Sequence, residues 1–181
     1  MEAVYMHEAA EFLLHALLIG LGATAIMDLW AAARKSLLNA PSPDYGLVGR
    51  WLAYLPRGCF RHNPITASPP MKGECLIGWT AHYLTGVAFA TVLLAIWGID
   101  WTCRPTVGPA LTVGIASVLA PFLLMQPGMG AGIAASRTPR PVVARLRSLL
   151  THGVFGIGLY VAGSTANSLG LYSCGIFVSG P

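Results

Sequence analysis

Residues 12–35 read FLLHALLIGLGATAIMDLWAAARK, an almost uncharged run that ends in the basic pair Arg34-Lys35. Its apolar part is long enough to cross the hydrocarbon core of a bilayer, which takes about 20 residues. Acidic residues come before the run, whereas a cleaved signal peptide carries a positively charged region in that place. We therefore expect residues 12–33 to form a permanent membrane-spanning helix.

Three further segments, residues 76–99, 107–125 and 149–171, have a similar length and apolar character. Hydrophobic residues make up 55% of the 181-residue chain and charged residues 10%, with a mean hydropathy of +0.63. A soluble domain has about a quarter charged residues, so this composition suits lipid rather than water. The sequence predicts one transmembrane domain over residues 1–181, an all-α integral membrane four-helix bundle.

Ten of the eleven Lys and Arg residues fall in two short stretches beside the apolar segments. Basic residues favour the cytoplasmic side of a membrane, and four spans put both stretches on that one side. We therefore expect a cytoplasmic loop over residues 36–74 and both termini outside. No basic face or recognised motif points to nucleic acid as a partner. The stretches hold Arg34, Lys35, Arg50, Arg57, Arg61 and Lys72, and then Arg137, Arg140, Arg145 and Arg147.

This topology divides the four cysteines between two compartments. Cys103 and Cys174 are expected outside, where an oxidising environment allows a disulfide, and Cys59 and Cys75 are expected on the reducing side. The alternative for the outer pair is two free thiols, because a sequence does not give the Cα separation that a disulfide requires. No metal-binding cysteine spacing is present.

The loop over residues 36–74 contains six prolines, which exclude a long helix. Within it, Ser42-Pro43-Asp44 is typical of a helix start. Apolar residues then follow at helical spacing, namely Leu47, Val48, Trp51, Leu52 and Leu55. This short helix either lies on the anionic inner leaflet or packs on the cytoplasmic ends of the bundle.

Pro121 and Pro127 interrupt the third apolar segment, and the run Gly128-Met-Gly-Ala-Gly132 follows directly. Broken backbone inside a membrane needs protein or a water-filled cavity to satisfy its polar groups, so we expect this region to face the bundle interior. Its small residues either permit close helix packing or form a half-helix end at a substrate site.

The two halves of the chain share a weak pattern. A methionine and a polar residue, Met27-Asp28 or Met125-Gln126, come before each basic stretch. The next helix in each half carries a small residue, a histidine and a glycine at four-residue intervals, namely Gly78, His82 and Gly86, and then Ser148, His152 and Gly156. This pattern is typical of a parallel duplication of two helical hairpins about an axis along the membrane normal.

Asp28 lies about 9 Å inside the boundary that Arg34-Lys35 marks, at 1.5 Å per residue of helix. An ionised carboxylate at this depth needs a partner. Lys35 lies two turns further along the same face and is long enough to extend toward that boundary. Asp28 is therefore either half of a structural ion pair or a proton or cation site.

His82 and His152 each lie on a helix face with small residues, which indicates a helix interface. Both are expected in the cytoplasmic half, so their side chains can approach each other. Either each histidine hydrogen-bonds to a neighbouring helix, or the pair binds a tetrapyrrole or a quinone. A haem would be noncovalent, because Cys-x-x-Cys-His is absent from the sequence.

The sequence lacks the phosphate-binding, zinc-protease and serine-hydrolase motifs, so we expect a non-enzymatic protein. The main hypothesis is an inner-half polar cluster of Asp28, His82, Gln126 and His152 that handles a proton or small solute in a homo-oligomer. The alternatives are a tetrapyrrole- or quinone-binding accessory subunit of a larger membrane complex, which uses His82 and His152, and a purely structural packing subunit. Neither a cofactor nor a metal is assigned.

Four runs occur in order along the chain: GLGATAIMDLW at residues 20–30, PSPDYGLVGRW at 41–51, GWTAHY at 78–83 and MQPGMGAG at 125–132. Together they resemble a bacterial family of small inner-membrane proteins of unknown function, over about residues 18–160. The resemblance implies a bacterial four-helix protein of the inner (cytoplasmic) membrane. It implies no reaction, ligand or catalytic residue.

Overall fold

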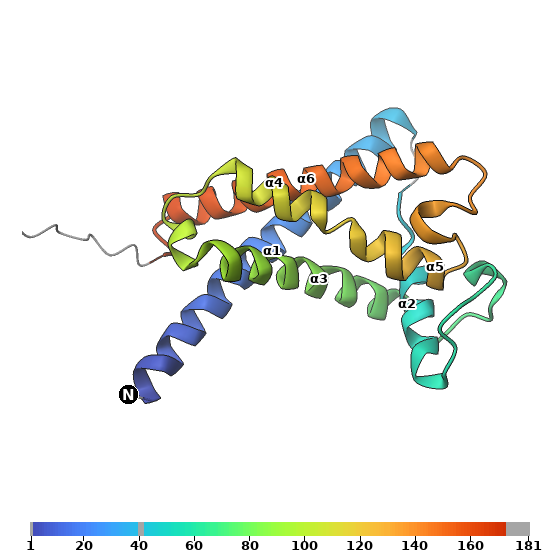
Figure 1. Ribbon diagram of the computed structural model, residues 1–181, viewed down its shortest axis with the longest axis horizontal. Helices are drawn as coiled ribbons and strands as arrows, with labels where there is room; N and C mark the ends of the chain where they lie inside the picture. The colour runs from blue at the N-terminus through green and yellow to red at the C-terminus, as the bar shows by residue number, and fades with distance from the viewer. Residues whose placement is uncertain (1, 40–41, 173–181) are drawn as a thin grey trace, which may run out of the picture.

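The computed structural model describes residues 2–39 and 42–172, and this part of the chain folds into helices joined by turns and loops (Figure 1). Four of the helical segments are long and apolar enough to cross a membrane. They are Val4–Leu38, Glu74–Trp97, Val107–Gly128 and Pro141–Ser168. The prediction of an all-α chain with four membrane-spanning helices is confirmed.

The first and last helices differ from the predicted bounds. Helix α1 runs from Glu2–Leu38, about 55 Å at 1.5 Å per residue, and so begins well before residue 12. The acidic residues before the apolar run do not interrupt a helix, because Glu is a good helix former. Helix α6, Pro141–Ser168, begins earlier than residue 149 because proline fits the first helical turn. It ends before Gly170, whose φ of 66° stops a helix.

The four long helices alternate in direction and enclose a small core (Figure 1). Helix α1 packs against both α3, Glu74–Trp97, and α6, while α4, Val107–Ala116, packs mainly on α6. The N-terminal part of α1 extends beyond the bundle (Figure 1). Short helical turns join or cap these helices, namely η1 Leu55–Arg57, η2 Ile65–Ala67, η3 Ile99–Thr102 and η5 Ile133–Ala135.

Glycine brings the helix backbones into contact at two crossings. In the α1–α3 crossing, a Cβ added to Gly20 would lie 2.7 Å from the backbone nitrogen of Val87, and one added to Gly86 would overlap Thr24. In the α4–α6 crossing, a Cβ on Gly114 would overlap the Cα of Gly156. Small residues of this kind let membrane helices approach closely, where van der Waals packing holds them together.

Large apolar side chains cover the outside of the bundle, as expected where lipid is the solvent. Leu84, Leu124 and Leu150 are each more than 60% exposed. The inside is filled by small and branched residues that are almost wholly buried. Those of the core half away from α2 include Ala16, Ile19, Ala23, Ala90, Leu93, Leu94 and Leu159.

Helix α2, Tyr45–Tyr54, packs across the first turns of α3, so the second of the two expectations for this segment matches the structure. Asp44 caps it by accepting the backbone N–H of Gly46 at 2.9 Å. The backbones of Gly49 and Gly78 meet at the crossing, where a side chain on either glycine would overlap the other helix. The Arg50 guanidinium donates two hydrogen bonds of 2.8 Å to the Glu74 carboxylate.

The third span is broken, as the sequence predicts. Helix α4 ends at Ala116, and a π-helical turn, η4 Pro121–Met125, leads into α5, Gln126–Gly128. The glycine-rich run that follows contacts the loop after α2: Gly128 packs on the Trp51 ring, and its carbonyl accepts the His62 N–H at 2.8 Å. The broken backbone is thus satisfied by protein, although by a loop and α2 rather than by another spanning helix.

Cys103 lies in the turn after η3, whereas Cys174 lies outside the described residues, so their predicted pairing stays a prediction. Cys59 and Cys75 are free, exposed thiols.

Gly114→Ala tests the close crossing of α4 and α6. The added Cβ overlaps Gly156 backbone, so we expect a loss of about 1–3 kcal/mol of stability, the usual cost of overpacking. Gly153→Ala is the control, because a Cβ there meets nothing within 4 Å. Thermal unfolding in detergent should separate the two variants by several degrees, and equal melting temperatures would contradict the crossing.

Glu74→Gln tests how α2 is held. The substitution keeps the side-chain volume but removes the charge that the Arg50 guanidinium pairs with, so α2 and its loop should detach more often. Trypsin should then cleave after Arg57 and Arg61 several-fold faster than in the unchanged protein. Glu8→Gln, at an exposed position of α1, is the control and should leave the cleavage rate unchanged.

Candidate functional site

Asp28 of α1 pairs with His82 of α3 inside the bundle. The Asp28 Oδ1 atom lies 3.0 Å from His82 Nε2, and the two side chains are only 19% and 10% exposed. The pair follows from the α1–α3 crossing, where Thr24 and Gly86 are in contact. Asp28 comes one turn after Thr24, and His82 comes one turn before Gly86, so the crossing brings these two side chains together. Close backbone approach at the crossing thus sets the distance between the two polar groups.

Three aromatic side chains surround this pair. Tyr45, the first residue of α2, stacks on the His82 ring with centroids 4.1 Å apart and an interplanar angle of 24°. Trp79 lies 4.6 Å from the Tyr45 ring, and Tyr83 lies edge-on to His82 at 5.5 Å. We call these five residues the Asp28 cluster. Its members come from α1, α2 and α3, so the cluster exists only when α2 is docked.

The two oxygens of the Asp28 carboxylate have different surroundings. Oδ1 faces His82 and also accepts a hydrogen bond from the Tyr45 hydroxyl at 3.4 Å. Oδ2 is buried and has no hydrogen-bond partner within 3.5 Å among the residues that the structure describes. Burial, and then the nearby Asp28 charge, raises the pKa of the Tyr45 phenol, so this group donates as a neutral hydroxyl.

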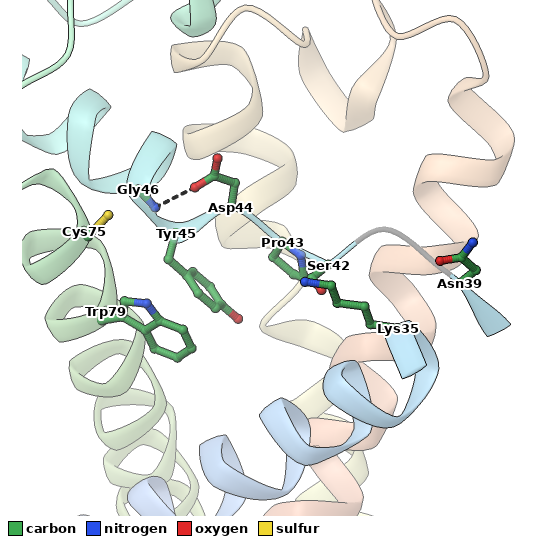
Figure 2. A pocket seen from close by; sticks show the side chains of 9 residues that line it. All are labelled: Lys35, Asn39, Ser42, Pro43, Asp44, Tyr45, Gly46, Cys75 and Trp79. Carbon is green, nitrogen blue, oxygen red and sulfur yellow. Dashed lines mark hydrogen bonds between the residues drawn. The ribbon is translucent and has the colours of Figure 1, made fainter. Parts of the chain in front are cut away.

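Lys35 does not take the place that the sequence suggested. No salt bridge joins it to Asp28 within the described part of the chain, and its side chain lines a cleft beside Tyr45 instead (Figure 2). The imidazole of His82 thus occupies the position that the prediction gave to an ammonium group. A lysine at the helix end reaches the aqueous interface more cheaply than it reaches a carboxylate two turns inside.

His152 forms a separate interaction on the other side of the bundle. Its Nδ1 lies 2.6 Å from the Ser117 hydroxyl of the third span, and that hydroxyl donates its proton to the Gly114 carbonyl at 2.6 Å. Because the hydroxyl has one proton, it accepts the second bond, so the Nδ1 of His152 carries the proton. Ser117 was not expected to take part in a polar contact.

The predicted polar residues therefore do not form one cluster. Asp28 and His82 are paired, and His152 is near enough to His82 for their charges to interact, but no ring contact joins the histidines in the described part of the chain. Gln126 hydrogen-bonds to none of them, and its Oε1 atom is buried without a partner.

Three members of the Asp28 cluster were missed as site residues. Trp79, Tyr45 and Tyr83 were not among the predicted site residues. The run PSPDYG, residues 41–46, does mark where α2 begins, and Tyr45 follows the Asp44 cap directly. What the sequence does not give is the Gly49–Gly78 crossing that places Tyr45 on His82.

No group of three or more His, Cys, Asp or Glu side chains in the described residues is arranged to hold a metal ion. His82 uses Nε2 for Asp28 and His152 uses Nδ1 for Ser117. Each histidine thus has one ring nitrogen already engaged, His82 with a carboxylate and His152 with a hydroxyl group.

A family model described as "Protein of unknown function (DUF2938)" matches residues 17–166. No curated protein and no solved structure matches the chain. The match covers Asp28, His82, Gln126 and His152, contains the second and third spanning helices whole, and begins at residue 17 within α1. The resemblance to an uncharacterised family is confirmed, and the chain belongs to this family of unknown function.

Proposed function

We propose that this protein is a non-enzymatic, multi-pass membrane module whose Asp28–His82 pair reversibly binds a proton. The main observation behind the proposal is a carboxylate enclosed by the bundle, with one oxygen 3.0 Å from an imidazole nitrogen. Its other oxygen is buried and has no hydrogen-bond partner within 3.5 Å in the part of the chain that the structure describes. Intramembrane ionisable residues are costly and mark proton or ion sites more often than they serve packing alone.

The net charge of the Asp28–His82 pair favours the uptake of a proton. When Nε2 carries a proton and donates it to Oδ1, the neutral imidazole and the ionised carboxylate together hold one negative charge. A proton added to His82 Nδ1 or to Asp28 Oδ2 makes the pair neutral overall. A pair without net charge costs less to bury among apolar residues than a charged one.

The location of the site rests on the predicted orientation of the chain. Both basic stretches adjoin helix ends at the α2 end of the bundle, where α1 ends and α3 and α6 begin (Figure 1). This supports a cytoplasmic α2 end in a bacterial inner membrane, with both termini outside. Asp28, His82 and His152 then lie in the inner half of the bilayer.

Comparison of the two hairpins supports a duplication. In each hairpin, a histidine lies one turn before a glycine at a helix crossing and bonds to the preceding spanning helix. His82 lies before Gly86 and bonds to α1, and His152 lies before Gly156 and bonds to the third span. The partners differ, since the counterpart of Asp28 is Ser117 and not the predicted Gln126. We propose that only the first copy keeps an ionisable pair.

The core of the bundle also has a consequence for the oligomeric state of the protein. The core half away from α2 is filled mainly by apolar residues that are buried completely or nearly so, among them Ile19, Leu93 and Leu94. We propose that any transfer across the membrane takes place in a homo-oligomer or in a complex with another membrane subunit.

Trp79 provides a natural reporter for proton binding, because its ring lies 5.9 Å from His82 and a charged imidazole quenches indole fluorescence. We expect a pH-dependent fluorescence step in the purified protein in lipid nanodiscs. Trp79→Phe and His82→Gln should abolish the step. Asp28→Asn should move it to lower pH, because the imidazolium loses its carboxylate partner.

His7→Gln is the matched control, since that histidine is exposed on α1 and should not affect the step. A step that persists unchanged in His82→Gln and Asp28→Asn would leave the pair with a packing role only.

An absorption spectrum of protein purified from its native membrane tests the tetrapyrrole alternative. A Soret band that disappears in His82→Ala and His152→Ala would replace the proton proposal.

A further inference from the structure

A cleft of about 480 Å³ opens beside the Asp28 cluster, between the end of α1, residues 42–46 and the first turns of α3 (Figure 2). We propose that this cleft is the route by which protons reach Asp28, that the Tyr45 hydroxyl is the final relay, and that the route opens to one side of the membrane. The proposal rests on the proton site described above and adds its path and its sidedness.

Tyr45 belongs to both the cleft and the buried pair. Its ring forms part of the cleft wall with Trp79 (Figure 2), while its hydroxyl donates to Asp28 Oδ1 at 3.4 Å. The docking of α2 on α3 fixes this position, because Tyr45 follows the Asp44 cap and its carbonyl touches Gly78. Among the described residues, no other polar side chain both contacts Asp28 and lines the cleft.

The chemistry of the relay balances. A hydronium in the cleft gives a proton to the Tyr45 oxygen, and the O–H bond of Tyr45 breaks as its proton passes to the carboxylate. One proton moves, the phenol is neutral before and after, and reversal of the two transfers releases the proton. The raised pKa of Tyr45 agrees with this concerted exchange, because it disfavours a lasting phenolate.

The lining of the cleft suits water rather than an apolar ligand. Lys35, Asn39, Ser42 and Asp44 contribute polar groups around its mouth (Figure 2). The inner wall is closed by Tyr45, which stacks on His82 and packs against Trp79. A proton passes this wall through one hydroxyl group, whereas any larger solute has to displace the stacked ring. The proton is therefore the substrate that fits the site as it stands.

The opposite direction from Asp28 is sealed. The next polar group along α1 is Thr24, which is fully buried and donates its proton to the Gly20 carbonyl at 2.7 Å. Beyond it, the facing residues Ala16, Ile19 and Ala23 are fully buried and apolar. This apolar layer separates the pair from His15, the next buried titratable residue along α1, which lies against the Tyr172 ring near the other end of the bundle. We therefore place proton exchange with the aqueous phase at the α2 end.

The charged and titratable groups around the pair come from each neighbouring element. Tyr45 faces it from α2 and Tyr83 from α3, while His152 of α6 acts on His82 at longer range. Lys35 and Asp44 add one charge of each sign to the lining of the cleft. Tyr45 and Tyr83 both interact with Asp28 and His82, but only Tyr45 of these two also lines the cleft.

Tyr45→Phe tests the relay, because it keeps the ring that stacks on His82 and removes the hydroxyl. After a rapid pH jump, the Trp79 fluorescence step should reach the same amplitude but at least about tenfold more slowly, the scale expected when a positioned proton-transfer group is lost. Tyr54→Phe is the matched control on the same helix, since its hydroxyl donates to Pro69 and not to the cluster.

Loss of the relay and loss of the site give different results. If only the relay proposal is wrong, Tyr45→Phe will show the same equilibrium fluorescence step at an unchanged rate, and this result would overturn the proposed path. If the proton-site proposal is wrong, the fluorescence step will not depend on Asp28 and His82. A Tyr45→Phe protein that has lost the equilibrium amplitude is judged by the thiol experiment below, which needs no change at Tyr45.

Cys75 is an exposed native thiol in the cleft lining and tests both access and sidedness (Figure 2). In a Cys59→Ser background, an impermeant, bulky methanethiosulfonate reagent should modify Cys75 in inverted membrane vesicles but not in intact cells, with the modified peptide identified by mass spectrometry. Modified protein should take up its proton several-fold more slowly. An unchanged rate, or modification of Cys75 from the cell exterior, would contradict the one-sided path.

Discussion

The structure depends on how an ionisable carboxylate is accommodated inside an apolar bundle. Asp28 cannot remain unpaired at this depth, since a charged side chain at a helix centre costs about 2.5–3.5 kcal/mol even on insertion scales. The α1–α3 crossing solves this by bringing His82 to within 3.0 Å of it. Substitution at Gly86 would move the two backbones apart and separate Asp28 from His82. The close packing of α1 and α3 is therefore also what keeps the polar pair together.

Helix α2 completes the arrangement from outside the bundle. The Gly49–Gly78 contact and the Arg50–Glu74 ion pair hold it on α3, and its first residue then covers the buried pair. The loop that follows donates two backbone hydrogen bonds to the end of the broken third span, from His62 to the Gly128 carbonyl and from Ile65 to the Met129 carbonyl. The segment between the first two spanning helices is thus a structural part of the site, and not only a connection.

The sequence predicts the four spans well because each depends on local composition. It also identifies Asp28, His82 and His152 as interior polar residues, since few polar groups are tolerated at that depth. It does not predict their partners: Lys35 was the expected partner of Asp28, whereas the structure pairs Asp28 with His82 and His152 with Ser117. Partners on different helices depend on crossing geometry, which a single sequence does not contain.

The central claim is that the Asp28–His82 pair exchanges a proton. Nitrogen-15 chemical shifts of the His82 imidazole, recorded by NMR in lipid over a range of pH, test it most directly. We expect a ring protonated on Nε2 alone at high pH and on both nitrogens at low pH, with this change displaced in Asp28→Asn. A ring protonated on Nδ1 alone, or shifts that are the same at every pH and in Asp28→Asn, would contradict the account.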